Sequence, residues 1–203
     1  MKKRIFTGII AFFIFAFSLQ AQNIFFNKDE RGFGVAGQVS SSDGSTLLGL
    51  SPNYTLNGKL TFGLTLGFEE NSSEDISSTA IRPYMSYLVL KQDNSNPISI
   101  AMNAAYQYNT FSDFDGLTAN TILLGLGIFH KINAGNNFDL IPGGSVGWGR
   151  TSVKFQGLSE DESAISYGLS LSGKFNKFYV TPSLTFSQGN SRFDLLLGII
   201  FPK

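Results

Sequence analysis

Hydrophobic and polar residues alternate along most of the chain. Residues 60–68 read LTFGLTLGF, with an apolar side chain at every even position, and residues 178–186 and 193–201 repeat the alternation. Successive side chains of a β-strand point to opposite faces, so a period of two predicts strands that each carry one apolar face. Beyond the first segment of the chain, no stretch shows a sustained helical period.

The alternation predicts ten strands separated by turn signals rich in Asn, Asp and Gly. A two-residue loop after the eighth strand would place Phe175 opposite Phe178. A three-residue loop after the second strand would place Leu56 opposite Leu60. Matching apolar faces across both hairpins favour neighbouring strands of one antiparallel meander. The predicted strands span residues 31–41, 46–56, 60–69, 79–91, 97–109, 119–132, 137–153, 163–175, 178–188 and 192–201.

The second face of these strands indicates which way the apolar face points. A water-soluble barrel turns apolar side chains inward and needs charges on its outer surface, whereas a membrane barrel turns them outward to lipid. In residues 61–67, 166–172 and 181–187 the second face carries only Thr, Ser and Gly. Such small, weakly polar side chains suit the crowded interior of a narrow barrel. The pattern therefore predicts lipid outside and a polar lumen inside.

Aromatic residues fall near both ends of the predicted strands. Two rings of aromatic side chains at the water interfaces are typical of membrane barrels. Near the short turns lie Tyr54, Tyr87, Phe138, Phe175, Phe178 and Phe201, and near the longer connections lie Phe68, Tyr106, Tyr108, Trp148, Tyr167, Phe186 and Phe193.

The predicted connections alternate in length, as in outer-membrane barrels with short periplasmic turns and longer outside loops. Residues 57–59, 133–136 and 176–177 form short connections, and residues 69–78, 111–118 and 155–162 form longer ones. An even number of strands then places both termini on the periplasmic side. Acidic residues gather in or beside the outside connections: Asp43, Glu69, Glu70, Glu74, Asp75, Asp113, Asp115, Glu160, Asp161 and Glu162.

Four prolines lie inside the predicted strands, all on the apolar face: Pro52, Pro83, Pro142 and Pro182. Proline cannot donate a hydrogen bond to a neighbouring strand and is usually confined to edges or bulges. Because a closed barrel has no edge, we expect bulges toward the periplasmic rim at these positions.

The first segment has the three parts of a secretory signal peptide. Lys2, Lys3 and Arg4 precede an apolar run over residues 5–17, and Ala21 offers a small residue for cleavage. The run is shorter than the ~20 residues that a membrane-spanning helix needs. We therefore assign residues 1–21 to a signal peptide and residues 22–203 to the barrel domain, with residues 22–30 as a short lead-in.

Composition narrows the function classes. The chain of 203 residues has 15 basic and 15 acidic side chains, so its net charge gives no reason to expect a nucleic-acid partner. Charged residues make up 15% of the chain, below the roughly 25% of a soluble domain. The lack of Cys rules out a disulfide scaffold, a cysteine zinc site and a thiol nucleophile.

The signal segment, the alternating strands and the last strand, residues 193–201, together resemble the small bacterial outer-membrane β-barrel proteins, a porin-like family of single-domain barrels. The resemblance implies an all-β, closed, antiparallel, up-and-down transmembrane barrel of about ten strands, with eight as an alternative, in the outer membrane. It also implies that the barrel-assembly machinery recognises the C-terminal strand. The family usually ends on the aromatic residue, whereas Pro202 and Lys203 follow Phe201 here.

Candidate chemistry is sparse. The single histidine, His130, shares the parity of outward-facing residues, which favours an interfacial anchor over a general base. The acidic clusters show no calcium-loop spacing, so solvated loops are favoured over a metal site. We predict no catalytic, cofactor-binding or metal-binding residue and no cofactor. Four charged residues are predicted to face the lumen: Arg82, Asp139, Lys174 and Asp194.

These features favour a structural or interaction scaffold of the cell envelope with acidic outside loops. A narrow porin-like channel for a small solute is the alternative, and a membrane hydrolase that depends on His130 is a third class. The expected partners are membrane lipid, lipopolysaccharide, the assembly machinery during insertion and an unknown surface protein.

Overall fold

The computed structural model describes residues 22–27, 29–42, 44–71, 76–112, 114 and 116–203. The predicted signal peptide, residues 1–21, lies outside the described residues, and so do the acidic residues Asp43, Glu74, Asp75, Asp113 and Asp115.

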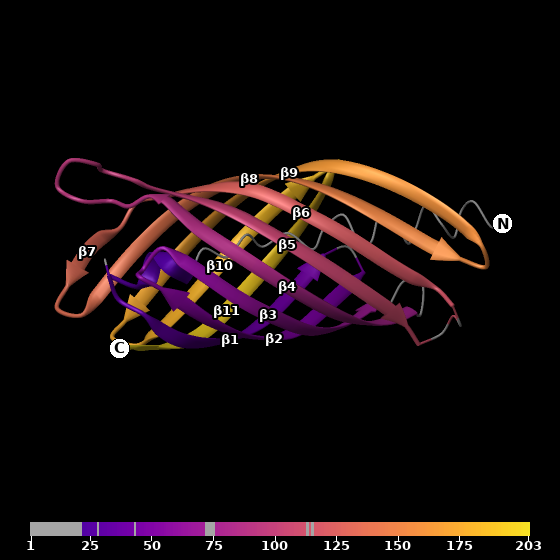
Figure 1. The fold of residues 1–203 in the computed structure, drawn as a ribbon, viewed down its shortest axis with the longest axis horizontal. Coiled ribbons are helices and arrows are strands. Elements are labelled where there is room, and N and C mark those ends of the chain that lie inside the picture. The colour runs from indigo at the N-terminus through magenta and orange to yellow at the C-terminus, as the bar shows by residue number, and fades with distance from the viewer. Residues whose placement is uncertain (1–21, 28, 43, 72–75, 113, 115) are drawn as a thin grey trace.

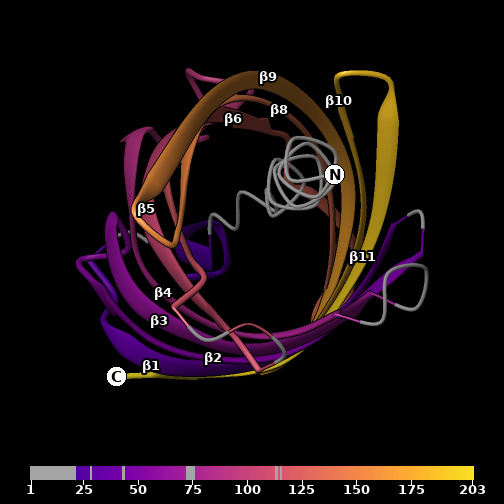
Figure 2. The same cartoon turned by 90° about the vertical axis from the view of Figure 1, so that its right-hand side faces the viewer.

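Ten antiparallel strands form a closed barrel, as predicted (Figures 1 and 2). Each wall strand pairs with its neighbours in the chain, β1 pairs with β11, and β6 pairs with β8, which completes the ring. The short β7 pairs only with β8. The elements are η1 (Gln22–Phe25), β1 (Gly32–Ser42), β2 (Ser45–Leu56), β3 (Leu60–Asn71), β4 (Ile76–Leu90), β5 (Ser99–Phe111), β6 (Thr118–Phe129), β7 (Ile132–Gly135), β8 (Phe138–Phe155), β9 (Leu158–Phe175), β10 (Phe178–Ser187) and β11 (Asn190–Pro202).

The barrel has two distinct ends. We call the end where β1 begins and β11 ends the proximal end, and the opposite one the distal end. Gly32 pairs with Pro202 at the proximal end, and β7 lies there as well (Figure 1). Within the described residues, no helix is long and apolar enough to cross a membrane.

The predicted hairpin register is confirmed at both turns. Phe175 pairs with Phe178, and Leu56 pairs with Leu60. Gly58 has a φ of 57°, so the left-handed conformation expected in that three-residue turn is present. A one-residue slip would have turned every apolar side chain of these strands into the lumen.

The connection lengths differ from the prediction. β8 and β9 are 18 residues each and meet in a two-residue turn at residues 156–157, so Phe155 and residues 158–162 are strand where a long loop was expected. β3 and β4 likewise extend into residues 69–78. A tilted transmembrane strand needs only about 9–11 residues. The distal side is therefore built largely from strands that continue past the membrane, with long loops playing a smaller part.

The expected bulges at the prolines are absent. Pro52 interrupts the pairing of β2 with β3, because Leu50 pairs with Leu66 and the next pair is Asn53 with Gly63. The ladder misses two pairs but keeps its register. The same gap without a shift occurs beside Pro83 and beside Pro182. The missing N–H thus removes a local hydrogen bond and does not displace the strand.

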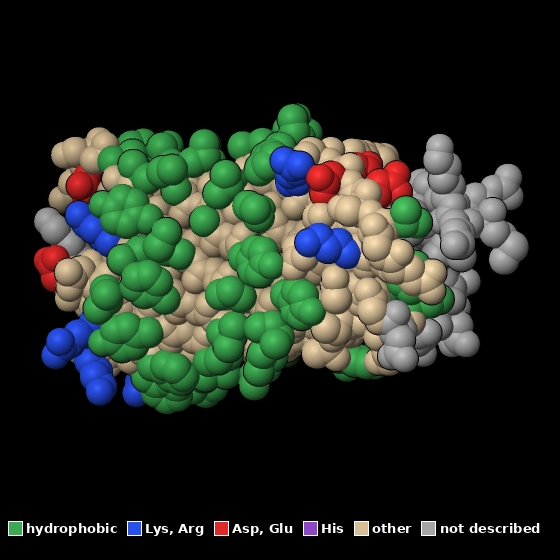
Figure 3. Space-filling view, turned by 45° about the vertical axis from the view of Figure 1, so that its right-hand side comes forward, with side chains coloured by type: hydrophobic (Ala, Val, Ile, Leu, Met, Phe, Trp, Pro, Cys, Tyr) green, Lys and Arg blue, Asp and Glu red, His purple; other side chains and the backbone are tan. Residues whose placement is uncertain are grey.

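The apolar face points outward, as predicted. Leu64, Leu126 and Leu197 are 37%, 47% and 57% exposed, whereas Thr61 and Thr65 on the second face are buried. Figure 3 shows hydrophobic side chains spread broadly over one face of the wall, with a surface poorer in them toward the distal end. All thirteen aromatic residues predicted for the two girdles are exposed on the outer surface. An apolar band of this kind matches the hydrocarbon layer of a membrane.

Candidate functional site

The middle of the lumen holds a network of charged side chains. Arg192 Nε lies 2.9 Å from Asp194 Oδ1, and these side chains are 2% and 0% exposed. Gln38 Nε2 donates to the same Asp194 oxygen at 3.2 Å, and Arg82 donates to Gln38 Oε1 at 3.3 Å. The prediction that Arg82 and Asp194 face the lumen is confirmed.

Glu69 corrects the sequence-based assignment of the acidic residues. It was assigned to an outside connection, but it lies in β3 with 2% exposure, and Ser45 Oγ donates to its Oε1 at 2.9 Å. Its parity with Thr61 and Thr65 was the signal that would have placed it in the lumen. Among the described residues, Glu69 and Asp194 are the buried carboxylates, and they match the buried guanidinium groups of Arg82 and Arg192 in number.

The other two predicted luminal charges lie at the proximal rim. Lys131 Nζ forms an ion pair with Asp139 Oδ2 at 2.9 Å. Lys174 lies opposite Asp139 in the pairing of β8 with β9. These side chains are half-buried, in contrast to the central network. They therefore border the entrance and do not fill the bore.

Apolar side chains cluster inside the distal part of the barrel. Val153 and Ala119 are fully buried there on neighbouring strands β8 and β6. Phe114 and Leu117, from the connection between β5 and β6, fold onto them, and the Phe114 ring meets Phe155 edge-on. This distal cluster consists of Ile76, Phe111, Leu117, Ala119, Val153 and Ala164, with Phe114 and Phe155 against it.

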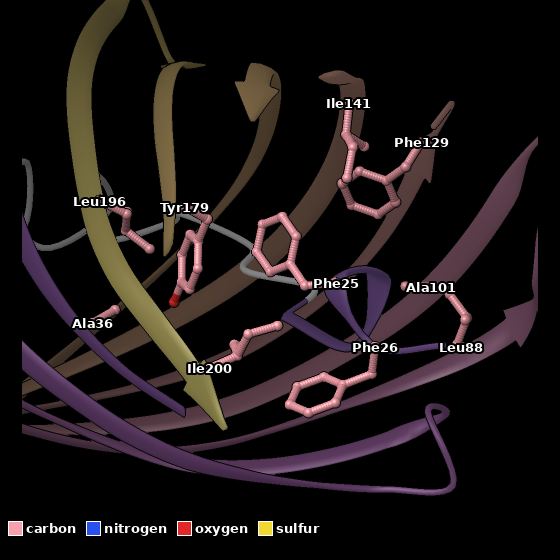
Figure 4. Close-up of a cluster of buried hydrophobic side chains, with 10 residues drawn as sticks. All are labelled: Phe25, Phe26, Ala36, Leu88, Ala101, Phe129, Ile141, Tyr179, Leu196 and Ile200. Atoms are coloured by element: carbon pink, nitrogen blue, oxygen red, sulfur yellow. The ribbon is translucent and has the colours of Figure 1, made fainter. Parts of the chain in front are cut away.

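The segment before β1 enters the proximal end of the barrel. Residues 22–30 were expected to form only a short lead-in, but Phe25 at the end of η1 and Phe26 directly after it lie inside the lumen, where both are buried. The Phe25 ring stacks on Tyr179 with centroids 4.4 Å apart. Figure 4 shows the two rings among side chains from the wall. We call residues 22–27 and 29–30 the plug, and its cluster comprises Phe25, Phe26, Ala36, Leu88, Ala101, Phe129, Ile141, Tyr179, Leu196 and Ile200.

Polar contacts hold the plug at its outer side. Lys91 Nζ donates to the Phe26 carbonyl oxygen at 2.6 Å, and the Gly58 N–H donates to the Glu30 carbonyl. A Cβ at Gly58 would collide with the Asn27 carbonyl, so glycine is required there for the close approach of the plug as well as for the turn. The alternation of residues 31–201 contains no signal for this docking.

Glycines on the inner face make room for the few bulky luminal side chains. The Tyr84 ring occupies the space that a Cβ at Gly63 would need, and Tyr179 does the same at Gly198. The two residues of each pair lie opposite each other on neighbouring strands, so a large side chain on one strand faces a glycine, which has no side chain, on the other. This matching lets a narrow barrel hold aromatic rings without pushing its strands apart.

His130 lies just after β6 and is exposed, as its parity predicted. Its Nδ1 donates to the Pro97 carbonyl oxygen at 2.6 Å. Among the described residues, no group of three His, Cys, Asp or Glu side chains could hold a metal ion. Glu160 and Asp161 are exposed on the β8–β9 hairpin, where Arg150 pairs with Asp161 at 2.9 Å.

Comparison with known proteins identifies the fold. No family model matches the chain, and no curated protein matches it. Among solved structures, the β domain of the Bordetella autotransporter BrkA has a TM-score of 0.57 at 10% identity and covers 86% of this chain and 100% of its own. A bacterial polysaccharide outer-membrane secretin has a TM-score of 0.52 at 11% identity. That match covers 87% of this chain but only 66% of the secretin chain.

The KdgM porin, at a TM-score of 0.43 and 14% identity, covers 83% of this chain and 99% of its own. The matched proteins are bacterial outer-membrane proteins, which agrees with an outer-membrane location for this chain. At these identities the likeness concerns the fold, and the content of the lumen must be interpreted from this chain's own residues.

Proposed function

The chain has the closed-barrel fold of bacterial outer-membrane proteins, and we propose that it is a non-conducting scaffold of the outer membrane. The observation that carries this proposal is the filling of the lumen at three depths. The plug occupies the proximal end, the Arg192–Asp194 network lies in the middle, and the apolar distal cluster lies beyond it. A solute would have to displace buried side chains at each depth.

The central network favours a filled interior over a water-filled pore. A charged side chain lining a pore would keep contact with water, but Arg192 and Asp194 are shielded from it. Their charges balance each other, Gln38 links Asp194 to Arg82 by hydrogen bonds, and the buried Glu69 offsets the charge of Arg82. Buried charges of this kind are tolerated when they are paired and hydrogen-bonded.

The distal hairpin offers a surface for interaction with a partner. The pairing of β9 with β10 ends at Ser166 opposite Ser187, and the carbonyl oxygens of Ser163 and Ile165 accept bonds from the side chains of Gln188 and Ser187. Residues 158–162 pair only with β8 among the described strands. An unpaired strand edge can accept an extended segment of another protein. Exposed Glu160 and Asp161 lie on this edge, which favours a partner segment with basic residues.

The position of each part of the barrel surface suggests further partners in the membrane. We propose that the outer apolar band contacts membrane lipid, that lipopolysaccharide surrounds the distal part, and that β11 is the strand recognised by the assembly machinery. Phe201 faces outward near the end of β11, as such a recognition strand requires. No catalytic role and no nucleic-acid partner belong to this proposal.

Planar-bilayer recording of the refolded full-length protein tests the proposal. We expect a silent bilayer for the natural chain. A double variant, Phe25→Ala with Phe26→Ala, serves as a comparison because it loosens only the proximal end. Steady single-channel steps from the natural chain would contradict a non-conducting scaffold.

A narrow channel for a small solute is the second candidate, and the plug is the observation that favours it. The plug is a chain segment outside the wall, so it could leave without unfolding the barrel. Polar luminal groups such as those of Asn53 and Asn103 lie beyond it, and such groups could be solvated by water in an open state. Transient rather than steady openings of the natural chain would support this candidate.

A further inference from the structure

Basic side chains are unevenly distributed between the two ends of the outer surface. In the described part of the chain, only Arg150 and Lys154 are basic residues of the distal outer surface, where the acidic residues of the β8–β9 hairpin are exposed as well. The proximal rim carries basic residues on several of its turns and strand ends, and Figure 3 shows Lys and Arg side chains there beside hydrophobic ones. The proximal rim therefore attracts anions more strongly than the distal surface does.

Two of the proximal cations lie side by side where β1 and β11 meet. The Lys203 N–H donates to the Arg31 carbonyl oxygen at 2.7 Å, directly beyond the last pair of these two strands. Both residues are exposed, and they continue the outward parity of Phe33 and Phe201. Like charges opposite each other on neighbouring strands repel. An anion bound between them removes that repulsion.

These two cations have no acidic partner in the described part of the chain. Neither Arg31 nor Lys203 belongs to any of the ion pairs found there, whereas Arg150 on the distal side is paired with Asp161 at 2.9 Å. Lys177 adds a third exposed cation in the turn between β9 and β10, beside the end of β11. The three charges are therefore available to an external anion.

The carboxylates near this group do not cancel its charge. Glu30 accepts bonds from the Asn27 backbone and side-chain amides at 2.7 and 2.6 Å, and it acts on Lys91 beside the plug. Asp29 is exposed in the plug. The group stays positive even when Asp29 and a terminal carboxylate on Lys203 are counted against its three cations.

Three aromatic rings border the cations on the membrane side. Phe33 pairs with Phe201 on β11 and with Tyr54 on β2, so the three lie in one row across neighbouring strands. All three are exposed on the outer surface. Aromatic rings at this level form the belt that meets the boundary between lipid head groups and acyl chains. A row of rings with cations on its watery side matches the two parts of an anionic lipid.

We propose that this surface binds an anionic phospholipid, with its phosphate between Arg31 and Lys203 and its acyl chains on the row of rings. A guanidinium can hold a phosphate by two parallel hydrogen bonds, and the ammonium adds a point charge. A zwitterionic lipid has the same phosphate but carries its own cation, so it binds less tightly. The lipid site rests on the proposed contact of the apolar band with membrane lipid, and it holds for a scaffold and for a channel.

Quenching of a single fluorophore tests the lipid site. The natural chain has no Cys, so Leu56→Cys provides one attachment point at the exposed end of β2, beside the site. The full-length protein is placed in phosphatidylcholine vesicles with a rising share of spin-labelled phosphatidylglycerol or spin-labelled phosphatidylcholine. We expect half-maximal quenching at an about fivefold lower share of the phosphatidylglycerol probe.

A matched reporter lies at the other end of the barrel. Ile122→Cys replaces an exposed residue opposite Arg150, the distal cation that already has a partner. We expect equal quenching by the two lipids there. Equal quenching at Leu56→Cys as well, or the same preference at both reporters, would overturn the lipid site alone. Quenching by neither lipid at either reporter would contradict the contact of the apolar band with lipid, and with it the proposed membrane protein.

Charge variants of the Leu56→Cys protein separate the site from the rim. Arg31→Gln with Lys203→Gln should abolish the preference for phosphatidylglycerol, and Arg31→Gln alone, which leaves β11 unchanged, should remove part of it. The control, Lys131→Gln with Lys174→Gln, removes two charges from the same rim outside the site and should keep the preference. Migration of the unboiled protein on a gel checks that each variant is folded. An equal loss in the folded control would assign the attraction to the general charge of the rim and overturn the site.

Discussion

Two ion pairs of equal length lie in different surroundings. Arg192 Nε and Asp194 Oδ1 are 2.9 Å apart inside the lumen, and Arg150 and Asp161 are also 2.9 Å apart on the distal hairpin. The luminal side chains are 2% and 0% exposed, whereas the hairpin pair is 55% and 44% exposed. Geometry alone does not separate these pairs, so water access must decide what each contributes.

The same difference in water access separates the lumen from the distal hairpin. Side chains in the lumen are shielded from water by the wall, the plug and the distal cluster, while the distal hairpin extends into solvent. A charge in the shielded part depends on its partner, because removing that partner leaves an uncompensated buried charge. A charge on the hairpin is solvated with or without its partner.

The largest expected effect is the difference in free energy of unfolding between breaking the luminal ion pair and breaking the hairpin ion pair. We expect Arg192→Met to lower the free energy of unfolding by about 3–5 kcal/mol. The matched variant Arg150→Met should lower it by less than about 1 kcal/mol. Urea titration in lipid vesicles, scored by the folded fraction on unboiled gels, measures both. Similar small losses would mean that water reaches the luminal pair and would break the comparison.

The double variant Arg192→Met with Asp194→Leu sharpens this result. It removes both charges, so no unpaired carboxylate remains in the lumen. We expect it to recover most of the stability lost in Arg192→Met. A double variant that is as unstable as the single variant would place the loss in packing and not in charge.

The two faces of β5 should show the next largest effect. Met102 faces outward into the apolar band, and the adjacent Asn103 faces the lumen. Met102→Lys should cost about 2–4 kcal/mol, because a lysine there faces hydrocarbon. Asn103→Ser should cost less, because it keeps a polar side chain in the lumen and adds no unpaired charge there. The same urea titration compares them, and a larger loss for Asn103→Ser would contradict the assignment of the faces.

The outer surface could be predicted from sequence because lipid imposes one rule at every depth. Leu64, Leu126 and Leu197 obey it, and so do both aromatic girdles. The lumen has no such single rule. The parity of Glu69 with Thr61 and Thr65 gives the face on which it lies. Whether it is solvated or buried there depends on the length of β3 and on Ser45 of the neighbouring strand, which the local pattern of residues 60–68 does not contain.

The plug shows the same limit more clearly. Phe25 and Phe26 lie outside any alternating segment, and their partners Tyr179 and Lys91 are distant in the chain. Gly58 could be assigned to its turn from sequence, but its second task, the close approach of Asn27, needs the folded chain. Non-local contacts of this kind leave no periodic signal.

A smaller effect should distinguish the plug cluster at the proximal end from the distal cluster. Phe25→Leu removes a stacked ring from the plug and keeps an apolar side chain, at a cost of roughly 0.5–1.5 kcal/mol beyond the area lost. Because the natural chain lacks Cys, a single reporter cysteine can be placed beneath the plug as Ala101→Cys. We expect its labelling by a thiol reagent to speed up several-fold, up to about tenfold, in Phe25→Leu.

The control is a reporter in the distal cluster, Ala164→Cys. Its labelling should not change in Phe25→Leu, because the distal closure belongs to the wall and to the connection between β5 and β6. Equal acceleration at both reporters would mean that the substitution loosens the whole barrel and that the plug is no separate element.

The smallest expected effect concerns Lys91, whose surroundings are intermediate between lumen and solvent. It follows the end of β4 outside the membrane, and burial beside the plug lowers its pKa from 10.5 to about 8. Between these values an undocked lysine binds more protons than the docked one, so plug docking should strengthen as the pH rises from about 8 toward 10.5. Hydrogen exchange of the plug, corrected for its intrinsic pH dependence, measures this trend.

Lys91→Met is the control for that measurement. The charged groups that act on Lys91 are Glu30, Asp29, Lys131 and Lys59, and any slope that they contribute remains in the variant. Subtracting the two slopes isolates Lys91. We expect the difference to be positive but modest, because Lys91 is only half-buried and water screens part of its interaction. A difference of opposite sign would mean that docking favours the charged lysine, with the Phe26 carbonyl and Glu30 outweighing its loss of water.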